Sequence, residues 1–200
     1  PFGNAKARAI VWTFPDRVPL HREPLYTPRR DLVADYPTWD DKEAIFRVPT
    51  LYKSIQDQDK SAEYPIILTS GRLVEYEGGG EETRSNPWLA ELQQEMFVEV
   101  NPKDANDIGF KDGDDVWVEG AEKGRIKVKA MVTRRVKPGL AFLPFHFGGK
   151  FEGEDLRSKY PEGTDPYVIG EAANTATTYG YDPVTLMQET KVTLCNIRKA

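Results

Sequence analysis

Small polar residues and arginines follow one apolar run of the sequence, and their chemistry suits an anion. The apolar residues 66–68 predict a buried strand, which continues into Ser70-Gly-Arg72. Three glycines at 78–80 and the pair Thr83-Arg84 come shortly after. Glycine and hydroxyl residues leave backbone N–H groups free, and arginine adds a planar charged donor. The stretch 64–84 therefore predicts a phosphate cradle, with a hairpin that has a glycine-rich tip as the alternative.

Standard motifs for nucleotide binding and nucleophilic catalysis are missing from the sequence. It has no G-x-G-x-x-G after an apolar run, no G-x-x-x-x-G-K-[ST] and no G-x-S-x-G. A Rossmann site, a P-loop and a hydrolase elbow are therefore not expected. Cys195 is the only cysteine, so neither an internal disulfide nor a cysteine-ligated cluster can form within this chain. With two histidines, His21 and His146, a zinc site would have to use mostly carboxylates, and no metal site is expected.

The composition is that of a soluble, acidic protein. The 200 residues are 39% hydrophobic and 30% charged, with a net charge of -5, which suits one domain, or one domain with an arm. An acidic chain whose bases are spread among acids is not expected to bind nucleic acid. No apolar run approaches a membrane span and no signal peptide is visible. The chain begins at Pro1, which predicts a processed chain or a piece of a longer one.

Residues 1–60 differ in composition from the rest of the chain. They hold seven of the fifteen prolines and one of the sixteen glycines, with aromatic residues between the prolines. Proline fixes the backbone and removes N–H donors, so this segment cannot build a long helix or a sheet. Its aromatic content excludes a disordered tail. We therefore expect residues 1–60 to form an extended arm that lies on another surface, and residues 61–200 to form the folded domain.

The rest of the chain shows short strands separated by glycine turns. Asn86 and Asn101, each followed by proline, predict two helix starts, and Gly109 can end the second helix. Residues 150–170 are expected to form a loop, and Cys195 to be a buried thiol. The first helix is expected to have an apolar face made of Trp88, Leu89, Leu92 and Met96. A barrel or sandwich follows from the predicted strands at 64–69, 97–100, 116–118, 126–132, 140–145 and 191–197.

Taken in order, several short motifs resemble one domain family. They are Ser70-Gly-Arg72 with Thr83-Arg84, Phe97-Val-Glu-Val-Asn-Pro-Lys-Asp104, Gly113-Asp-Asp-Val116, Gly124-Arg-Ile-Lys-Val128, Pro144-Phe-His-Phe147, Asn174 and Lys191. Their order and spacing resemble the C-terminal dinucleotide-binding domain of molybdopterin oxidoreductases, most of all that of the large subunit of formate dehydrogenases. The resemblance covers residues 64–200, and more loosely residues 1–60. It implies a mainly β fold with short helices: a six-stranded double-psi β-barrel of the aspartate-decarboxylase-like type, preceded by the extended arm.

The resemblance also implies a ligand and the residues that hold it. The ligand is the guanine dinucleotide form of molybdopterin, two copies of which (bis-MGD) hold one molybdenum or tungsten. A pyrophosphate needs N–H groups and arginine, a lysine can add charge, and an asparagine can bind the amide edge of pterin or guanine. By resemblance the cofactor-binding residues are Ser70, Gly71, Arg72, Leu73, Val74, Glu75, Tyr76, Gly78, Gly79, Thr83, Arg84, His146, Asn174 and Lys191.

Some of these residues also fit ordinary structural roles. His146 fits a satisfied interior histidine as well as a cofactor contact, Asn174 fits a helix or turn cap, and Lys191 fits a solvated strand edge. Many members of the family have histidine near the positions of Tyr76 and Gly78, which this chain lacks, so the contacts over 76–83 stay open.

The implied function is that of a cofactor-binding domain in a formate dehydrogenase, which oxidises formate to carbon dioxide and passes two electrons to iron–sulfur clusters. The metal-ligating cysteine or selenocysteine of the family, its neighbouring histidine and the cluster cysteines are missing from this sequence, so the chain is not expected to be active alone. The expected partners are the remaining catalytic domains of the large subunit and an iron–sulfur electron-transfer subunit, in the periplasm or otherwise the cytoplasm. Two alternatives stay open: the same domain of a nitrate or sulfur-oxyanion reductase, and a non-catalytic module that docks a subunit.

Overall fold

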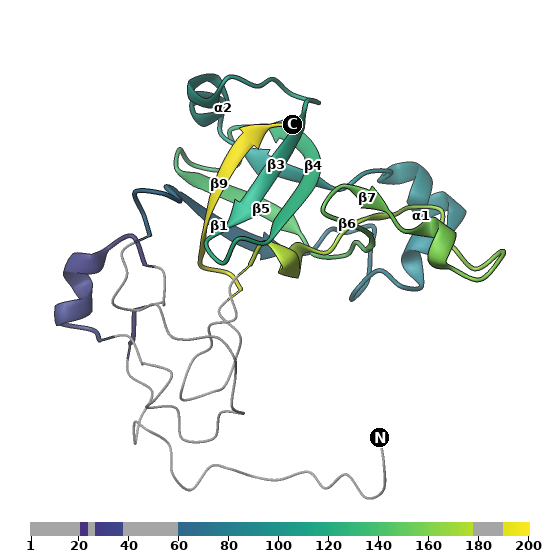
Figure 1. Cartoon of the computed structure of the whole chain (residues 1–200), viewed down its shortest axis with the longest axis horizontal. Helices are drawn as coiled ribbons and strands as arrows, with labels where there is room; N and C mark the ends of the chain where they lie inside the picture. Colours follow the sequence, from purple (N-terminus) through teal and green to yellow (C-terminus); the bar gives the residue numbers. More distant parts are fainter. Residues whose placement is uncertain (1–20, 24–26, 38–59, 178–189) are drawn as a thin grey trace, which may run out of the picture.

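A closed β-barrel forms the centre of the protein (Figure 1). The computed structural model describes residues 21–23, 27–37, 60–177 and 190–200. Six strands close in the order β1-β5-β2-β4-β3-β9. The predicted six-stranded barrel is therefore confirmed, and each predicted strand overlaps one of its members. These are β1 Ile66–Gly71, β2 Phe97–Val100, β3 Asp115–Gly120, β4 Arg125–Val132, β5 Leu140–Pro144 and β9 Thr193–Lys199.

The strand pairing mixes parallel and antiparallel neighbours. β1 runs parallel to β5, and β2 runs parallel to β4, whereas β9 is antiparallel to both of its neighbours, β1 and β3. The parallel register pairs Gly71 of β1 with Pro144 of β5. Both strands therefore end at the same edge of the barrel, and the segments that follow them leave the barrel side by side.

Alternation along the strands fills the barrel interior. β1, β3 and β4 alternate buried and partly exposed residues, because successive side chains of a strand point to opposite faces. The core is mostly aliphatic, and Leu68, Ile126 and Leu143 are among its fully buried members. Cys195 on β9 is also fully buried, as predicted, and this burial raises the pKa of its thiol.

Two short helices begin where the sequence predicts. α1 spans Pro87–Leu92, and the side chain of Asn86 accepts the N–H groups of its first turn. α2 spans Pro102–Ile108 and is capped in the same way by Asn101. It ends at Gly109, whose φ of +94° lies in the left-handed region that glycine adopts readily.

The predicted apolar face of α1 is wrong for Trp88 and Leu92, whereas Leu89 packs against the core as predicted. Within the helix Ala90 is the buried residue, whereas Trp88 and Leu92 are 77% and 71% exposed. Met96 is buried but lies beyond the helix end. A helix of 6 residues makes fewer than two turns, so it cannot extend one face from Trp88 to Met96.

A second, three-stranded sheet occupies the segment predicted as a loop. It contains β6 Gly149–Phe151, β7 Glu154–Asp155 and β8 Gly170–Glu171, in the order β7-β6-β8. The loop prediction is wrong for these strands, because strands of two and three residues are too short to leave a periodic pattern. The residues between β7 and β8 contain no strand, as predicted. In Figure 1, β6, β7 and α1 are drawn on the same side of the barrel, and α2 at one end of it.

Only part of the predicted arm is described. Its described residues include a 3₁₀ turn, η2 Arg30–Ala34. The backbone N–H of Glu23 donates to the carbonyl oxygen of Tyr36 at 3.1 Å, and the Thr27 hydroxyl donates to the Glu23 carboxylate at 2.7 Å. The other residues of 1–59 lie outside the described part of the chain. The extended arm and the boundary near residue 60 therefore stay predictions.

Candidate functional site

The ends of β1 and β5 bring distant parts of the sequence to one edge of the barrel. Gly71 and Pro144 form the last pair of their parallel ladder. The first residue of β9, Thr193, pairs with β1 in the antiparallel direction, so the residues just before β9 come close to the end of β1. Three segments therefore converge at this edge: 70–72, 145–147 and 190–191.

Two cations lie against the ring of Phe145. The Nζ atom of Lys191 is 5.1 Å from the ring centroid, and the Cζ atom of Arg72 is 5.5 Å from it. Lys191 also donates to the backbone oxygen of Ser70 and, at 3.4 Å, to the Ser70 hydroxyl. Partial burial and the charge of Arg72 both lower the pKa of Lys191. Two like charges held together at a strand end favour an anion beside them.

A cavity of about 330 Å³ opens at this edge of the barrel. Asn174 reaches it from the 3₁₀ turn η6 Ala173–Thr175, and Gly79 from the glycine loop. The cavity thus combines a cation, an amide that can donate and accept, and two aromatic rings. Four predicted site residues share it, because its lining consists of Ser70, Gly79, Phe145, Phe147, Ala172, Ala173, Asn174, Thr190 and Lys191.

The loop after β1 is tied to the barrel by His146, which is fully buried. Its Nε2 accepts the Leu73 N–H at 2.8 Å, and its Nδ1 lies 2.7 Å from the Gly78 carbonyl oxygen. Both ring nitrogens are therefore bonded to the loop backbone. Gly80 has a φ of +77°, and a Cβ there would lie 2.1 Å from the His146 carbonyl oxygen. Only glycine fits at position 80, because any side chain there would clash with the His146 carbonyl oxygen.

Arg84 is buried, and its guanidinium is directed at backbone oxygens. Nε donates to the Gly80 oxygen at 3.1 Å, and Nη1 donates to the oxygens of Gly148 and Val168 at 2.9 and 3.2 Å. Burial lowers the pKa of Arg84. These bonds join the glycine loop to the segments before β6 and β8. Arg84 thus stabilises the glycine loop, and it is not among the residues that line the cavity.

Two further predicted residues also hold the loop. The Tyr76 hydroxyl donates to the Gln93 carbonyl oxygen, and its ring meets Phe147 edge-on with centroids 5.5 Å apart. The Thr83 hydroxyl accepts the Glu77 N–H at 3.2 Å. Desolvation by burial raises the pKa of Tyr76. The remaining predicted residues, which are not among the residues that line the cavity, are Gly71, Leu73, Val74, Glu75 and Gly78.

Several residues that line the cavity are not among those predicted from the sequence. They include Phe145 and Phe147, which flank His146, and Thr190, which precedes Lys191. The two phenylalanines could have been found from the sequence. In an extended segment the two neighbours of a residue share one face, so Phe145 and Phe147 are expected on the same face, opposite to His146. No comparable signal marks Ala172, Ala173 or Thr190.

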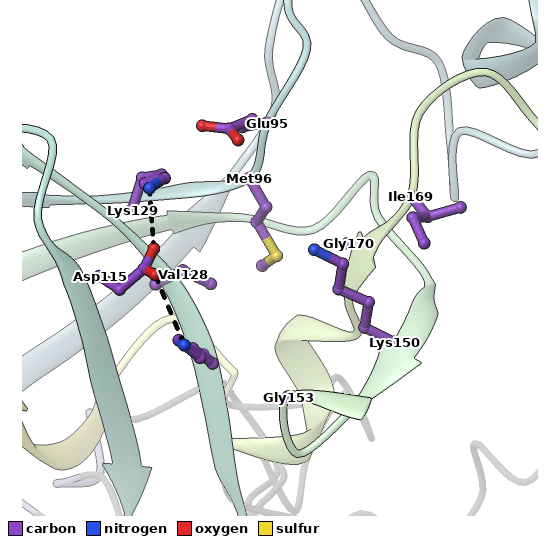
Figure 2. A pocket seen from close by; sticks show the side chains of 10 residues that line it. Glu95, Met96, Asp115, Val128, Lys129, Lys150, Gly153, Ile169 and Gly170 are labelled. Carbon is purple, nitrogen blue, oxygen red and sulfur yellow. Dashed lines mark ion pairs between the residues drawn. The ribbon is translucent and has the colours of Figure 1, made fainter. Parts of the chain in front are cut away.

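A second cavity, of about 250 Å³, lies between the barrel and the small sheet (Figure 2). Asp115 of β3 pairs there with Lys129 at 2.9 Å and with Lys127 at 3.5 Å, both on β4. Lys150 approaches from β6. None of the predicted site residues lines this cavity. Its ion pairs connect neighbouring strands, which is an ordinary structural role.

The sequence matches the model of a known family from β1 to the start of β9. That family is described as the molydopterin dinucleotide binding domain, and the match covers residues 66–194. The chain belongs to this family. It is a molybdopterin dinucleotide-binding domain, which makes molybdopterin its cofactor, and it is homologous to the large subunits of formate dehydrogenases. The predicted family is thereby confirmed.

Curated relatives are much longer than this chain. Formate dehydrogenase 2 subunit alpha (cytochrome c-553) of Nitratidesulfovibrio vulgaris is 34% identical over 193 residues, which are 91% of this chain and 17% of the relative. Formate dehydrogenase subunit alpha of Megalodesulfovibrio gigas is 33% identical over 68% of this chain and 13% of its own length. The periplasmic nitrate reductase of Desulfovibrio desulfuricans is 34% identical over 54% of this chain and 14% of its own length.

A solved structure shares the fold. Acetylene hydratase from Pelobacter acetylenicus matches 78% of this chain and 21% of its own chain, with a TM-score of 0.54 and 19% identity. Within the described part of the chain, no helix has the length and apolar character needed to cross a bilayer.

Proposed function

We propose that this chain holds the guanine dinucleotide form of molybdopterin within a formate dehydrogenase. One observation carries the proposal: Ser70, Gly79, Asn174 and Lys191, which the family resemblance selects from distant parts of the sequence, line a single cavity. Arg72 lies beside it, against Phe145.

The residues at the cavity fit the parts of a dinucleotide. Arg72 and Lys191 supply two positive charges for a pyrophosphate, and a charged donor strengthens each bond to it. The Asn174 amide can pair with the donor and acceptor edge of guanine or pterin. Phe145 and Phe147 offer apolar ring surface to a base and exclude water from it. The chain thus binds and orients the ligand, whose metal centre supplies the redox chemistry when bound.

The activity proposed for the whole enzyme is oxidation of formate to carbon dioxide. This chain spans 17% of the Nitratidesulfovibrio relative, so the proposal assigns the molybdenum or tungsten ligand, a second dinucleotide and the iron–sulfur clusters to other parts of the enzyme. The proposed partners are the remaining catalytic domains and an iron–sulfur subunit that accepts two electrons. The proposed location is the periplasm, which the name of the Desulfovibrio desulfuricans relative supports, and cell fractionation tests it.

Purification of the native enzyme tests the cofactor proposal. Mass spectrometry of the released cofactor should find the guanine dinucleotide of molybdopterin, and metal analysis should find molybdenum or tungsten. A native complex that contains this chain but neither pterin nor metal would contradict the proposal and favour a module that only docks a subunit.

Nitrate reduction is the second candidate. Two relatives favour it, the periplasmic nitrate reductase and the assimilatory nitrate reductase catalytic subunit of Bacillus subtilis, which is 26% identical over 64% of this chain. Activity of the native enzyme with formate and a dye acceptor, and not with nitrate or sulfur oxyanions and a dye donor, would select the first candidate.

A further inference from the structure

His146 differs from the other predicted site residues because the loop after β1 takes up both of its ring nitrogens. The side chain has 0% exposure and packs against two rings, with its centroid 4.7 Å from that of Phe145 and 6.2 Å from that of Tyr76. Nε2 lies 2.8 Å from the Leu73 nitrogen and Nδ1 lies 2.7 Å from the Gly78 oxygen. No ring nitrogen is left to bind a ligand directly.

The two bonds define the protonation state of the ring. The Leu73 N–H can only donate, so Nε2 must present its lone pair. The Gly78 carbonyl can only accept, so Nδ1 must carry the proton. The ring is therefore the neutral Nδ1–H tautomer, which offers one acceptor and one donor in a rigid frame.

Both bonds lie next to residues at the cavity. Arg72 immediately precedes Leu73, and Gly79 immediately follows Gly78. The backbone of His146 is itself held in place, because His146 lies directly after Phe145 at the end of β5, and β5 is paired with β1. The segment between the two bonds, which contains the fully exposed Val74 and the buried Tyr76, is thus anchored at both ends.

We propose that His146 is a positioning residue, which holds Arg72 and Gly79 at the cavity by bridging the Leu73 N–H and the Gly78 carbonyl. The inference rests on the proposed function, because the position of this loop matters to a ligand only if the cavity binds one. His146 acts through the backbone and does not touch the dinucleotide with its ring nitrogens.

The tautomer is tested on the 200-residue chain itself. Nitrogen-15 NMR of the imidazole should show a protonated Nδ1 and an unprotonated Nε2 for His146, with a hydrogen-bonded Leu73 amide. An imidazolium or the Nε2–H tautomer at neutral pH would overturn the inference. This measurement needs no variant, so it is independent of any loss of stability.

Three substitutions separate the two bonds. In His146→Asn the amide nitrogen lies near the position of Nδ1, so the bond to Gly78 can form while Leu73 loses its acceptor. In His146→Gln the amide oxygen can take the place of Nε2, so Leu73 keeps an acceptor and the bond to Gly78 is lost. His146→Phe keeps a ring and loses both bonds. The Leu73 amide should exchange about tenfold faster in the Asn and Phe variants than in the Gln variant.

The chain's other histidine provides the matched control for these measurements. His21 bonds Glu23 at 2.8 Å and packs on Tyr36, so His21→Gln should leave exchange in the loop unchanged. Equal exchange of Leu73 in all three His146 variants would show that the ring does not hold the loop, and would overturn the inference.

A double-mutant cycle in the native enzyme tests the effect on the ligand. His146→Phe should lower the affinity for the dinucleotide about tenfold. In a protein that already carries Arg72→Ala, His146→Phe should lower the affinity much less, because the contact of Arg72 with the ligand is already lost. If the fold-losses of affinity of the two single variants multiply in the double variant, His146→Phe destabilises the protein generally. That result would overturn this inference and leave the proposed function standing. Wild-type enzyme without any dinucleotide would overturn the proposed function first, and this inference with it.

Discussion

Arg72 and Arg84 are two arginines close in sequence whose environments differ completely. Arg72 is exposed at the end of β1 and lies over Phe145 with its charge available. Arg84 is 8% exposed and donates to three carbonyl oxygens. The sequence predicted both as phosphate donors, because residue type and nearness to glycine are the same for both. Only the fold shows that the guanidinium of Arg72 is exposed beside Phe145, whereas that of Arg84 holds the chain.

Arg72→Ala should weaken dinucleotide binding more than folding. Removal of one charged donor to a phosphate costs roughly 1.5–3 kcal/mol of binding free energy, whereas an exposed side chain contributes little to stability. Cofactor content and melting temperature of the native enzyme, measured beside the exposed-site control Arg134→Ala, check this. Full cofactor content together with a melting temperature lowered by several degrees would make Arg72 structural.

Arg84→Lys should weaken folding more than dinucleotide binding, the reverse of Arg72→Ala. A lysine keeps the charge but cannot direct donors to the oxygens of Gly80, Gly148 and Val168 together. Leaving buried carbonyl groups unpaired costs about 1–3 kcal/mol of unfolding free energy. Urea denaturation of the variant and of Arg134→Lys gives the comparison. Equal stability of the two would show that the three bonds contribute nothing.

Cys195 predicts a pH dependence of stability at alkaline pH. Burial raises the pKa of this thiol above its ordinary value of 9.0, so above that pH the unfolded chain loses a proton that the folded chain keeps. Stability therefore falls as pH rises, by up to about 1.4 kcal/mol per pH unit. Urea midpoints between about pH 8 and pH 10 should fall more steeply for the wild type than for Cys195→Ala. Parallel slopes would contradict the assignment, because other titrating groups are common to both proteins.

At the level of elements, Glu171 joins the small sheet to the barrel. It is fully buried on β8, and its Oε1 accepts the N–H of Lys127 on β4 at 3.2 Å and that of Gly153, in the β6–β7 turn, at 2.5 Å. Its Oε2 has no hydrogen-bond partner among the described residues. One oxygen of a β8 residue thus binds both a strand of the barrel, β4, and the β6–β7 turn of the small sheet.

Two substitutions of Glu171 distinguish the contribution of its acceptor oxygen to stability from that of its negative charge. Glu171→Ala removes the acceptor of two partly buried hydrogen bonds and should lower the unfolding free energy by about 1 kcal/mol for each of them. Glu171→Gln keeps an acceptor oxygen and should remain near the wild-type stability. Hydrogen exchange at the amides of Lys127 and Gly153 provides the local measurement. Slow exchange at both amides in the alanine variant would show that the carboxylate does not connect the sheets.

The sequence predicted the barrel strands well, and the small elements poorly, for a physical reason. β4 carries three buried residues at period two within eight residues, which is a long signal, whereas β7 and β8 have two residues each. The face of α1 was misplaced because a run of apolar residues does not show where a helix ends. His146 was located but its role was not, since its partners Leu73 and Gly78 are brought to it only by the β1·β5 pairing.

At the level of the whole molecule, the arm and the barrel are predicted to differ in their resistance to protease. The prolines of residues 1–60 prevent a core of their own, and their aromatics need cover from the barrel or from neighbouring domains. Cleavage near residue 60 should therefore release a stable barrel from the isolated chain, and the same sites should be protected in the native enzyme. Limited proteolysis with mass spectrometry checks both. A compact, resistant fragment of residues 1–60 would contradict the prediction.

The closing strand of the barrel links cofactor loading to the order in which the protein is made. β9 pairs with β1 and with β3, and Ile66 finds its partner Cys195 far along the chain. Until β9 leaves the ribosome, β1 and β3 have open edges that can pair with other chains and aggregate. Contacts of such long sequence separation also form slowly. Thr190 and Lys191 complete the cavity only once β9 is in place, so the site proposed for the dinucleotide exists in the finished barrel and not in the nascent one.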